Sequence, residues 1–568
     1  MRRRGVAQLA RVRALGAWGR RFESSHPDQY KHHVYSFTML LTVLTAAKSP
    51  GISGGLSYES DSDIADGCIV QVPLRNKSVE GIVLGSSKPV GDFDLKKIQN
   101  QLFESPLLTQ AHIRTVQWMS EYYCCSLRQA MRVFLPSPPW EALIPKKVTR
   151  YKLQETKNVQ GSKQQLIIDY LSENESATWD EMRSEMQISR TTIKSLVDKG
   201  IVIEEQCPEF SIFNLQSSII RPCLTPQQKS AYEIIKNSDK PSLLFGVTGS
   251  GKTEVYAQLI SDTVEAGKQA ILLVPEILLT EANINRFTDL LGAESVAMLH
   301  SRLTPAQKRN EWKRIRFGDV KLVIGSRSAL FAPVTDLGLV IIDEEHEWTY
   351  KNEQTPRYHA RETAEILCKE FGAKLVMGTA TPSIESWHRA TAIDRYTFAR
   401  LDDRYGDATM PLVKVIDLAQ VKFGNDYPFS NTLFDAIEDR LQKGEQSILF
   451  LNRRGIATSM MCLDCKRRIV SPDSNLPFTV HRKGESVYLQ DHTTGAIAEV
   501  PSECPGCNSV NLRPIGAGTQ RVEEIITRRF PNARIIRADA DTLKHPEQMR
   551  LLLKKMLENQ ADILLGTQ

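Results

Sequence analysis

Residues 243–253 read Leu243-Leu-Phe-Gly246-Val-Thr-Gly-Ser-Gly251-Lys252-Thr253. An apolar strand here leads into the spacing G-x-x-x-x-G-K-[ST], in which backbone N–H groups at the start of a helix wrap phosphates. We expect Gly246, Gly249 and Gly251 to shape this loop. Lys252 would then reach the terminal phosphates, and Thr253 would bind Mg²⁺. Taken alone, the stretch could also be a glycine-rich turn without a ligand.

A second motif, Leu339-Val-Ile-Ile-Asp343-Glu344-Glu345-His346, weakens that alternative. Its apolar strand ends in two acids, which places Asp343 where it can hold the metal ion and Glu344 where it can polarise the attacking water. The two motifs together predict an enzyme that hydrolyses a nucleoside triphosphate with Mg²⁺. Its predicted catalytic residues are Lys252, Asp343 and Glu344.

Further helicase motifs lie before, between and after these two stretches, in the order found in superfamily 2 helicases. They read Leu224-Thr-Pro-Gln-Gln228, Val274-Pro-Glu-Ile-Leu-Leu-Thr280, Leu299-His-Ser-Arg302, Val323-Ile-Gly-Ser-Arg327-Ser-Ala-Leu-Phe331 and Met377-Gly-Thr379-Ala-Thr-Pro-Ser383. The set resembles the PriA family of replication restart helicases, from roughly residue 37 to the end of the chain. Two phrases make the resemblance specific, because general helicases lack them: Ile-Gly-Ser-Arg-Ser-Ala-Leu-Phe and, at residues 358–361, Tyr-His-Ala-Arg.

This resemblance implies an ATP-dependent 3′→5′ DNA helicase in the bacterial cytoplasm. Such a helicase recognises stalled or abandoned replication forks and starts primosome assembly, in replication restart and DNA repair. Its partners would be branched and single-stranded DNA, single-stranded-DNA-binding protein and other primosome proteins, and Gln228 would read the adenine of ATP. The rival interpretation is a non-catalytic restart factor that binds fork DNA.

Aromatic and basic side chains follow the two acids. Trp348, Tyr350 and Tyr358 could stack on bases, and a stacked base could then move the water-activating carboxylate, since they lie close to Glu344 in the sequence. Arg327 and Arg361 are further candidates for DNA contact or for this coupling. The alternative is ordinary core packing of the three aromatic residues.

The predicted fold class is multidomain α/β, with two RecA-like helicase lobes that carry parallel sheets and hold ATP between them. A small β-rich domain and a winged helix precede the lobes. The predicted boundaries are a basic extension at 1–36, a β-rich domain resembling the family's 3′ DNA end-binding domain at 37–140, a winged helix at 155–215, lobe one at 221–400, and lobe two at 401–568 with a zinc-binding insertion at 460–512.

For two of these modules, a function that involves no contact with DNA is also possible. The β-rich domain could be a barrel with a structural role, since its match around Leu56-Ser-Tyr58 is weak. In the winged helix, the polar opening of the third helix would place Arg190 and Lys194 against duplex DNA. The module could instead serve only as a spacer.

Four cysteines of the insertion form two C-x-x-C pairs, Cys462, Cys465, Cys504 and Cys507. Four thiolates suit tetrahedral Zn²⁺ and leave no open position, so the predicted site is structural. Redox chemistry is the alternative.

The restart family usually carries eight cysteines and two zinc ions in this insertion. Here Ser471, Ser474, Asp491 and Thr494 stand where the other four thiols are expected. Neutral hydroxyls are poor zinc ligands, so we predict one zinc ion.

The composition of the chain limits the classes of protein to which it can belong. The 568 residues carry a net charge of +5, which excludes a histone-like binder and requires local patches for any DNA contact. The sequence has no apolar run of about eighteen residues, so we expect no membrane span. The first 22 residues carry seven arginines and no acid. They could be a disordered extension, a start codon assigned too early, a targeting peptide or a DNA contact.

The chain ends with Asp562-Ile-Leu-Leu-Gly566-Thr567-Gln568, which resembles the opening of the fifth helicase motif. The arginine-bearing sixth motif would follow it. We therefore expect either a piece of a longer gene product or a DNA-binding relic with little turnover, because loss of an arginine finger commonly costs about 10³–10⁵ in phosphoryl transfer.

Overall fold

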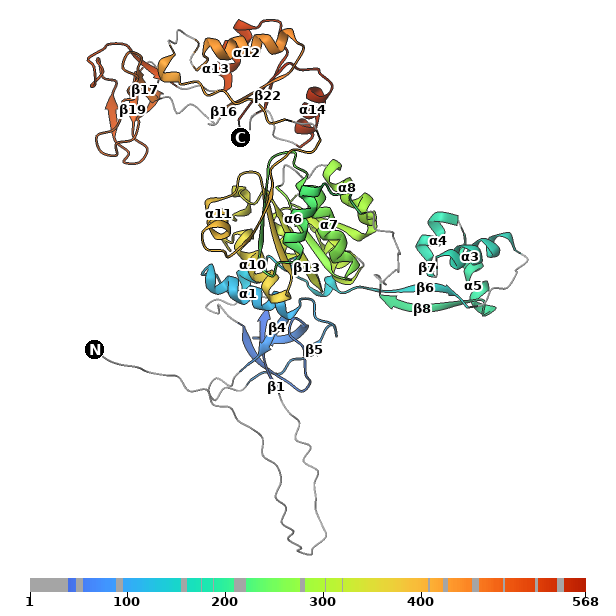
Figure 1. Cartoon of the computed structure of the whole chain (residues 1–568). Helices are drawn as coiled ribbons and strands as arrows, with labels where there is room; N and C mark the ends of the chain where they lie inside the picture. Colours follow the sequence, from blue (N-terminus) through green and yellow to red (C-terminus); the bar gives the residue numbers. More distant parts are fainter. Residues whose placement is uncertain are drawn as a thin grey trace, which may run out of the picture. The chain divides into compact units, whose positions relative to one another are not determined.

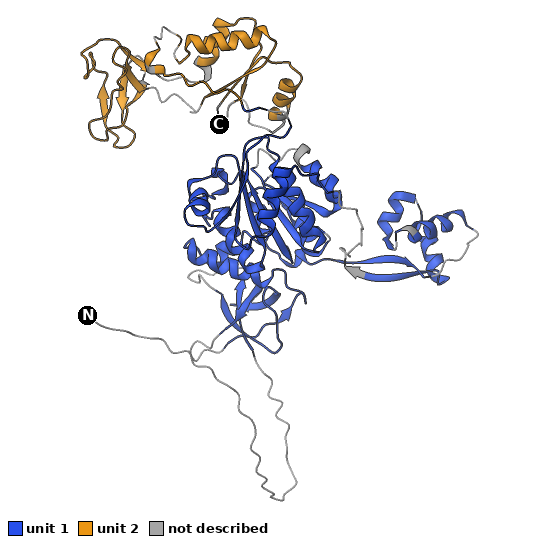
Figure 2. Ribbon diagram, in the orientation of Figure 1, with its two compact units in different colours: residues 1–410 blue, residues 411–568 orange. Residues whose placement is uncertain are grey.

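The structure is a computed structural model, which places most of the chain well enough to describe. The described residues are 39–46, 55–87, 95–154, 161–174, 176–186, 188–208, 221–275, 281–301, 303–318, 320–406, 409–421, 426, 428–451, 459–483, 486–515, 519–538 and 546–567. The predicted extension at 1–36 lies outside them. The chain divides into two compact units, residues 1–410 and 411–568 (Figure 2).

An antiparallel sheet opens the first unit, in the strand order β2-β1-β4-β3-β5. Its strands are β1 (Met39–Thr45), β2 (Leu56–Ser60), β3 (Ile69–Leu74), β4 (Lys77–Ser86) and β5 (Asn100–Gln101). Alternating side chains bury one face, where Val43, Tyr58 and Val70 belong to one apolar cluster. The other face contributes Leu44, Ile69 and Ile82 to a larger core.

That larger core joins the β-rich domain to the helicase lobe. Its connecting elements are α1 (Gln110–Tyr122), α2 (Leu127–Met131) and the 3₁₀ helix η1 (Glu141–Leu143), and α1 packs against α10 (Ala360–Phe371) (Figure 1). Hydrogen bonds cross the junction as well: for example, Trp312 Nε1 donates to the Phe134 carbonyl at 3.1 Å, and Arg316 Nε donates to the Leu107 carbonyl at 3.1 Å. The two domains therefore share one hydrophobic core.

Residues 147–208 form a module with a core of its own. Its elements are β6 (Lys147–Leu153), α3 (Ser162–Glu173), β7 (Ser176–Thr178), α4 (Trp179–Met186), α5 (Arg190–Asp198) and β8 (Val202–Pro208), with the strands in the order β7-β6-β8. Ile167, Leu171, Met182 and Leu196 fill the space between the helices and the strands. The winged-helix assignment of this module stays a prediction.

A seven-stranded parallel sheet forms the centre of the first unit (Figure 1), in the order β11-β12-β10-β13-β14-β9-β15. The strands are β9 (Ser242–Gly246), β10 (Gln269–Leu273), β11 (Val296–Leu299), β12 (Leu322–Gly325), β13 (Leu337–Asp343), β14 (Lys374–Thr379) and β15 (Thr397–Leu401). The helical elements are α6 (Pro226–Lys236), α7 (Lys252–Glu265), α8 (Glu281–Leu291), η3 (Ala293–Ser295), α9 (Pro305–Phe317), η4 (Arg327–Phe331), η5 (Trp348–Tyr350), α10 and α11 (Ile384–Thr391).

Both faces of this sheet are buried, which explains the continuous apolar runs of its strands. Within β9, Leu243 belongs to one core cluster and Leu244 to the other, and Val340 and Ile341 of β13 divide in the same way. The predicted multidomain α/β fold with a parallel helicase sheet and a β-rich domain before it is confirmed.

The second unit contains a three-stranded parallel sheet in the order β16-β23-β22. Its elements are η6 (Leu418–Gln420), α12 (Asn431–Gln442), β16 (Ser447–Leu451), α13 (Thr519–Arg529), β22 (Ile535–Ala538), α14 (Pro546–Leu557) and β23 (Ile563–Thr567). Phe434, Ile437, Val522 and Ile563 are buried between the helices and the sheet.

An insertion between β16 and α13 forms a five-stranded antiparallel sheet in the order β20-β19-β18-β17-β21. Its strands are β17 (Ser459–Cys462), β18 (Thr479–Lys483), β19 (Ser486–Gln490), β20 (Ile497–Glu499) and β21 (Leu512–Ile515). Its small core contains Met460, Ile469, Phe478 and Leu489. Among the described residues, no helix is both long and apolar enough to cross a membrane.

Candidate nucleotide, DNA and metal sites

The phosphate loop, residues 246–252, connects β9 to α7. Gly249 has a φ of 81° and Gly251 a φ of 79°, in the left-handed region that glycine adopts at little cost. A Cβ atom on Gly251 would also lie only 2.3 Å from Gln228 Nε2. Both the backbone and its surroundings therefore require glycine at position 251.

No side chain of the described residues caps the N-terminus of α7, so its first backbone N–H groups point into the loop without a side-chain acceptor. Lys252 Nζ donates to the Gly246 carbonyl at 3.0 Å, across the mouth of the loop. Thr253 is exposed on the first turn. These residues fit a triphosphate with Mg²⁺: the loop offers N–H donors, an ammonium and a free hydroxyl on one side.

Gln228 lies beneath this loop and is 1% exposed. Its Nε2 donates to the Ser250 carbonyl at 3.0 Å, and its Oε1 accepts from the Thr225 backbone N–H at 2.9 Å. Both ends of the amide are thus occupied by the protein. These bonds tie Gln228 to the phosphate loop, and its role in reading adenine stays a prediction.

Asp343 ends β13 opposite the phosphate loop. Tyr256, on the buried face of α7, donates its hydroxyl to Asp343 Oδ1 at 2.8 Å. Gly378 leaves the space for this hydroxyl, because a Cβ atom there would lie 1.5 Å from the Tyr256 oxygen. Burial raises the pKa of Asp343 above its ordinary value, although this hydrogen bond and the charge of Lys252 work in the opposite direction. Neither the Tyr256 hydrogen bond nor the space at Gly378 was predicted from the sequence, because the motif pattern gives neither residue a role in this contact.

Glu344 adopts a φ of 48°, which is uncommon for a residue with a side chain. His346 Nδ1 lies 3.6 Å from Glu344 Oε2 and 2.8 Å from Thr379 Oγ1. The imidazole therefore bridges the predicted water-activating carboxylate and Thr379, the last residue of β14. Strained backbone at such a position is typical of functional sites, where the surrounding structure holds it in place.

Glu345 forms a buried ion pair with Arg361 of α10, with Arg361 NH1 2.9 Å from Glu345 Oε2. The same carboxylate accepts hydrogen bonds from the Ser383 backbone N–H at 2.7 Å and from the Ser386 hydroxyl at 2.8 Å. Arg361 is only 5% exposed, so it cannot contact DNA directly, and that part of its prediction is corrected here. Arg361 instead joins the acidic motif to the start of α11. Loss of one partner of such a pair typically costs about 3–5 kcal/mol.

The three predicted stacking residues occupy different environments. Trp348 is 70% exposed, whereas Tyr350 is 1% and Tyr358 is 3% exposed. A buried ring offers no face to a base, so the stacking interpretation is wrong for Tyr350 and Tyr358, which pack in the core as the alternative had it. Burial raises the pKa of Tyr358 to about 12.

Tyr350 and Arg327 nevertheless connect Trp348 to the site. The Tyr350 hydroxyl donates to the Asp343 backbone carbonyl at 2.6 Å. Arg327 NH1 donates to the carbonyls of Thr349 and Lys351, at 2.8 Å each. The 3₁₀ helix η5 is thus fixed at several points, with Trp348 at its exposed start.

A cleft of about 670 Å³ lies between the β-rich domain and the helicase lobe. Its cations, Arg128, Arg132, Lys308 and Arg309, come from α2, the segment after it and α9. None of the described residues that line it is acidic. Arg132, Lys308 and Arg309 make no side-chain hydrogen bond or ion pair with other described residues, whereas Arg128 NH1 donates to the Ala46 carbonyl at 2.7 Å. We call this hollow the basic cleft.

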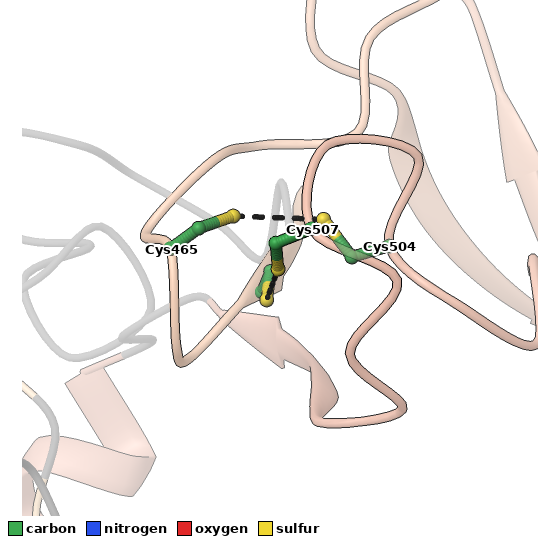
Figure 3. A group of neighbouring side chains, drawn as sticks. Cys465, Cys504 and Cys507 are labelled. Carbon is green, nitrogen blue, oxygen red and sulfur yellow. Dashed lines mark hydrogen bonds between the residues drawn. The ribbon is translucent and has the colours of Figure 1, made fainter.

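The four predicted cysteine ligands meet between two turns of the insertion (Figure 3). All four sulfurs lie within 4.8 Å of one another, and the pairs Cys462–Cys507 and Cys465–Cys504 are 3.6 Å apart. A tetrahedral zinc with bonds of about 2.3 Å needs sulfurs about 3.8 Å apart. Backbone N–H groups of Cys465 and Asp464 help lower the pKa of the Cys462 thiol to about 6. The cluster fits Zn²⁺, and its thiols are free.

Other predicted positions have their own outcomes. Arg190 and Lys194 are exposed on α5, with the Arg190 guanidinium 5.6 Å from the centre of the Trp179 ring. The motif positions 276–280, 302 and 568 lie outside the described residues.

Two parts of the first unit match models of known protein families. A DEAD/DEAH box helicase model matches residues 225–390, and a 3′ DNA-binding domain model matches residues 46–136. The replication restart protein PriA of Chlamydia pneumoniae is 32% identical over 533 residues, which cover 90% of this chain and 71% of the relative. The chain belongs to the PriA family of replication restart proteins.

The PriA protein of Bacillus subtilis is 42% identical over 422 residues, covering 72% of this chain and 52% of the relative. The chain therefore spans about half the length of that PriA and under three quarters of the chlamydial one. A solved structure of RecG bound to a three-way DNA junction is 21% identical over 61% of this chain and 36% of its own, with a TM-score of 0.34, which is too low to support any argument.

Proposed function

We propose that the chain carries the motor of an ATP-dependent 3′→5′ DNA helicase that acts at stalled or abandoned replication forks and starts primosome assembly. One observation carries this proposal: the phosphate loop, Asp343 and Glu344 are held together around the carboxyl ends of β9 and β13 in a member of the PriA family. Branched and single-stranded DNA would be the substrates. Single-stranded-DNA-binding protein and other primosome proteins would be the partners, in the bacterial cytoplasm.

The proposed reaction divides the work among the residues of the site. When bound, Mg²⁺ neutralises charge on the triphosphate. The α7 N-terminus and Lys252 would bind and orient the phosphates, and Thr253 and Asp343 would hold the metal. Glu344 would orient the attacking water and accept its proton at the carboxylate, next to His346. Tyr256 would be a positioning residue, because its hydroxyl donates to Asp343 Oδ1 and so orients the carboxylate that would hold the metal.

Binding of DNA would be communicated to the ATP site through Trp348. A base stacked on the exposed indole would shift η5, and Tyr350 would carry that shift to the backbone of Asp343 through its hydroxyl. The distance along the chain is short, since Asp343 and Tyr350 are seven residues apart. We therefore propose that Trp348 contacts the DNA base and that Tyr350 connects Trp348 to Asp343.

Replacing Trp348 with alanine should remove most of the stimulation of ATP hydrolysis by single-stranded DNA, because one stacked base is worth roughly 1–3 kcal/mol. Tyr350→Phe keeps the buried ring and removes only the hydroxyl that donates to Asp343, so it should lower the same ratio without weakening DNA binding. The measurement is ATP hydrolysis with and without single-stranded DNA, together with DNA affinity.

Tyr122→Ala is the matched control, since this tyrosine is 58% exposed on α1 of the same unit. An unchanged stimulation ratio in the Trp348 variant, with lower thermal stability, would show that the indole only packs on its neighbours and would remove the sensor from the proposal.

The basic cleft would hold the backbone of single-stranded DNA. Cations crowd there without acids: burial and the like charge of Arg132 both lower the pKa of Arg128, and a bound phosphate would relieve the repulsion between the two. The cleft also borders the carboxyl end of β11, at the edge of the sheet where ligands of parallel folds bind. Buried Trp140 and Trp312 form part of its apolar floor.

Changing Arg132 and Lys308 together to alanine should weaken binding of single-stranded DNA. It should also lower the slope of log affinity against log salt by about 0.7 for each phosphate that the protein no longer neutralises. Lys369→Ala, an exposed cation on α10, is the control. A slope that stays the same would reject the cleft as a DNA site. Weaker binding of an acidic peptide with normal DNA binding would assign the cleft to a protein partner instead.

The second candidate is a restart factor that binds forks without effective hydrolysis. This candidate is favoured if the chain binds forked DNA while its rate of ATP hydrolysis stays at the background level. Single-turnover hydrolysis with saturating forked DNA separates the two candidates.

A further inference from the structure

Four tight turns in the insertion share one backbone geometry. They begin at Cys462, Ser471, Asp491 and Cys504. In each turn the N–H of the first residue donates to the carbonyl five residues later, at 2.9, 2.8, 2.9 and 2.8 Å in that order. Only two of these turns carry the C-x-x-C pairs described above.

The fifth residue of each turn has a positive φ. The values are 60° for Lys466, 56° for Asn475, 79° for Gly495 and 57° for Asn508. Since residues other than glycine rarely adopt this conformation, its recurrence at the same place in four turns indicates one shared backbone design.

The side chain that opens each turn accepts hydrogen bonds from the turn itself. Gly506 N donates to Cys504 Sγ at 3.4 Å, Asp473 N to Ser471 Oγ at 3.3 Å, and Thr493 N to Asp491 Oδ1 at 2.9 Å. Cys462 receives the matching backbone bonds from Asp464 and Cys465. Each turn is therefore built to hold an acceptor atom at its first position, whether that atom is sulfur or oxygen.

The turns that begin at Ser471 and Asp491 also form a pair. The hydroxyls of Ser471 and Ser474 both bond to the Asp491 carboxylate, and Thr494 Oγ1 donates to Asp491 Oδ2 at 2.8 Å. Ser471 is 0% and Asp491 is 3% exposed. The first and fourth residues of both turns thus converge, as the four cysteines do in the other pair. We call this group the Asp491 cluster.

We propose that the second turn pair is a metal-site scaffold in which the Asp491 carboxylate has taken over the role of the metal ion. A tetrathiolate site is held by one cation that attracts four ligands. The Asp491 cluster reverses this arrangement: one anion accepts hydrogen bonds from three hydroxyls and from the turn backbone. Because these donors occupy its oxygens, the carboxylate has little capacity left for a cation.

The sharpest test restores the four thiols in the full chain. The variant Ser471→Cys/Ser474→Cys/Asp491→Cys/Thr494→Cys should bind two zinc ions per chain by elemental analysis, against one for the unchanged chain. The variant with only Ser471→Cys and Ser474→Cys is the control for added thiols and should bind one. One zinc in a folded four-cysteine variant, with β18 and β19 intact by hydrogen exchange, would overturn the scaffold interpretation.

A second test addresses the carboxylate. Asp491→Asn replaces an acceptor oxygen with an NH₂ group that faces hydroxyl and N–H donors, so the insertion should become more sensitive to protease while zinc at the cysteine site is retained. Asp473→Asn, an exposed acid in the neighbouring turn, should behave like the unchanged chain. Equal protease resistance in both variants, or two metal ions in the unchanged chain, would refute the role proposed for Asp491.

Discussion

Lys252→Ala is expected to abolish ATP hydrolysis and to weaken nucleotide binding. Among the described residues of the phosphate loop, Lys252 carries the only cation. Its ammonium donates to the Gly246 carbonyl, across the mouth of the loop. Loss of one preorganised donor to developing charge typically costs about 10²–10³ in rate. The measurements are steady-state ATP hydrolysis and the affinity for a fluorescent ATP analogue.

Glu344→Gln tests the role assigned to the second catalytic residue, which acts on the attacking water. It should also abolish hydrolysis but keep nucleotide affinity near normal, because we assign this carboxylate to the attacking water and not to the phosphates. Glu353→Gln, an exposed acid past η5, is the matched control and should change neither quantity. Equal loss of nucleotide affinity in the Lys252 and Glu344 variants would contradict both roles.

Zinc removal is the second change for which we expect a large effect. The purified chain should hold one zinc ion, and Cys504→Ser should lose it and unfold the insertion. Metal binding in small zinc peptides supplies roughly 10–16 kcal/mol of apparent free energy, and the insertion has only a small core of its own. Elemental analysis would measure the zinc content, and hydrogen exchange of β17 to β21 would measure the unfolding.

Cys124→Ser is the control, because this exposed thiol lies far away in the sequence and outside the cluster. Retention of zinc after Cys504→Ser would mean that another residue completes the site. Two zinc ions in the unchanged chain would mean that the Asp491 cluster binds metal.

The sequence motifs predicted the phosphate loop, the acidic motif and the cysteine cluster, because in each case the contacts lie within a short segment or follow a known ligand spacing. They also indicated the parallel sheet, since strands such as β10 and β13 are apolar throughout. The contact of Gln228 with the phosphate loop was not predicted, because its amide bonds to a loop more than twenty residues away in the chain.

Contacts between distant segments account for the other differences. Arg361 stands among polar residues in the sequence, yet it pairs with Glu345 and bonds to Ser383 and Ser386. Tyr256 of α7 has no motif signal, and its role depends on the space that Gly378 leaves in β14, more than a hundred residues later. Burial of Tyr350 and Tyr358 likewise depends on tertiary packing, which a local pattern of aromatic and basic residues does not encode.

The shared core of the first unit has a consequence for how the protein is made. Ile113 and Met119 of α1 pack in the same cluster as Trp312 of α9 and Leu367 of α10. A ribosome adds about 5–20 residues per second, so the roughly 200 residues that separate α1 from α9 take on the order of 10–40 s to synthesise. During that interval the apolar side of α1 has no partner from the helicase lobe. The nascent chain should therefore depend on chaperones until α10 has left the exit tunnel.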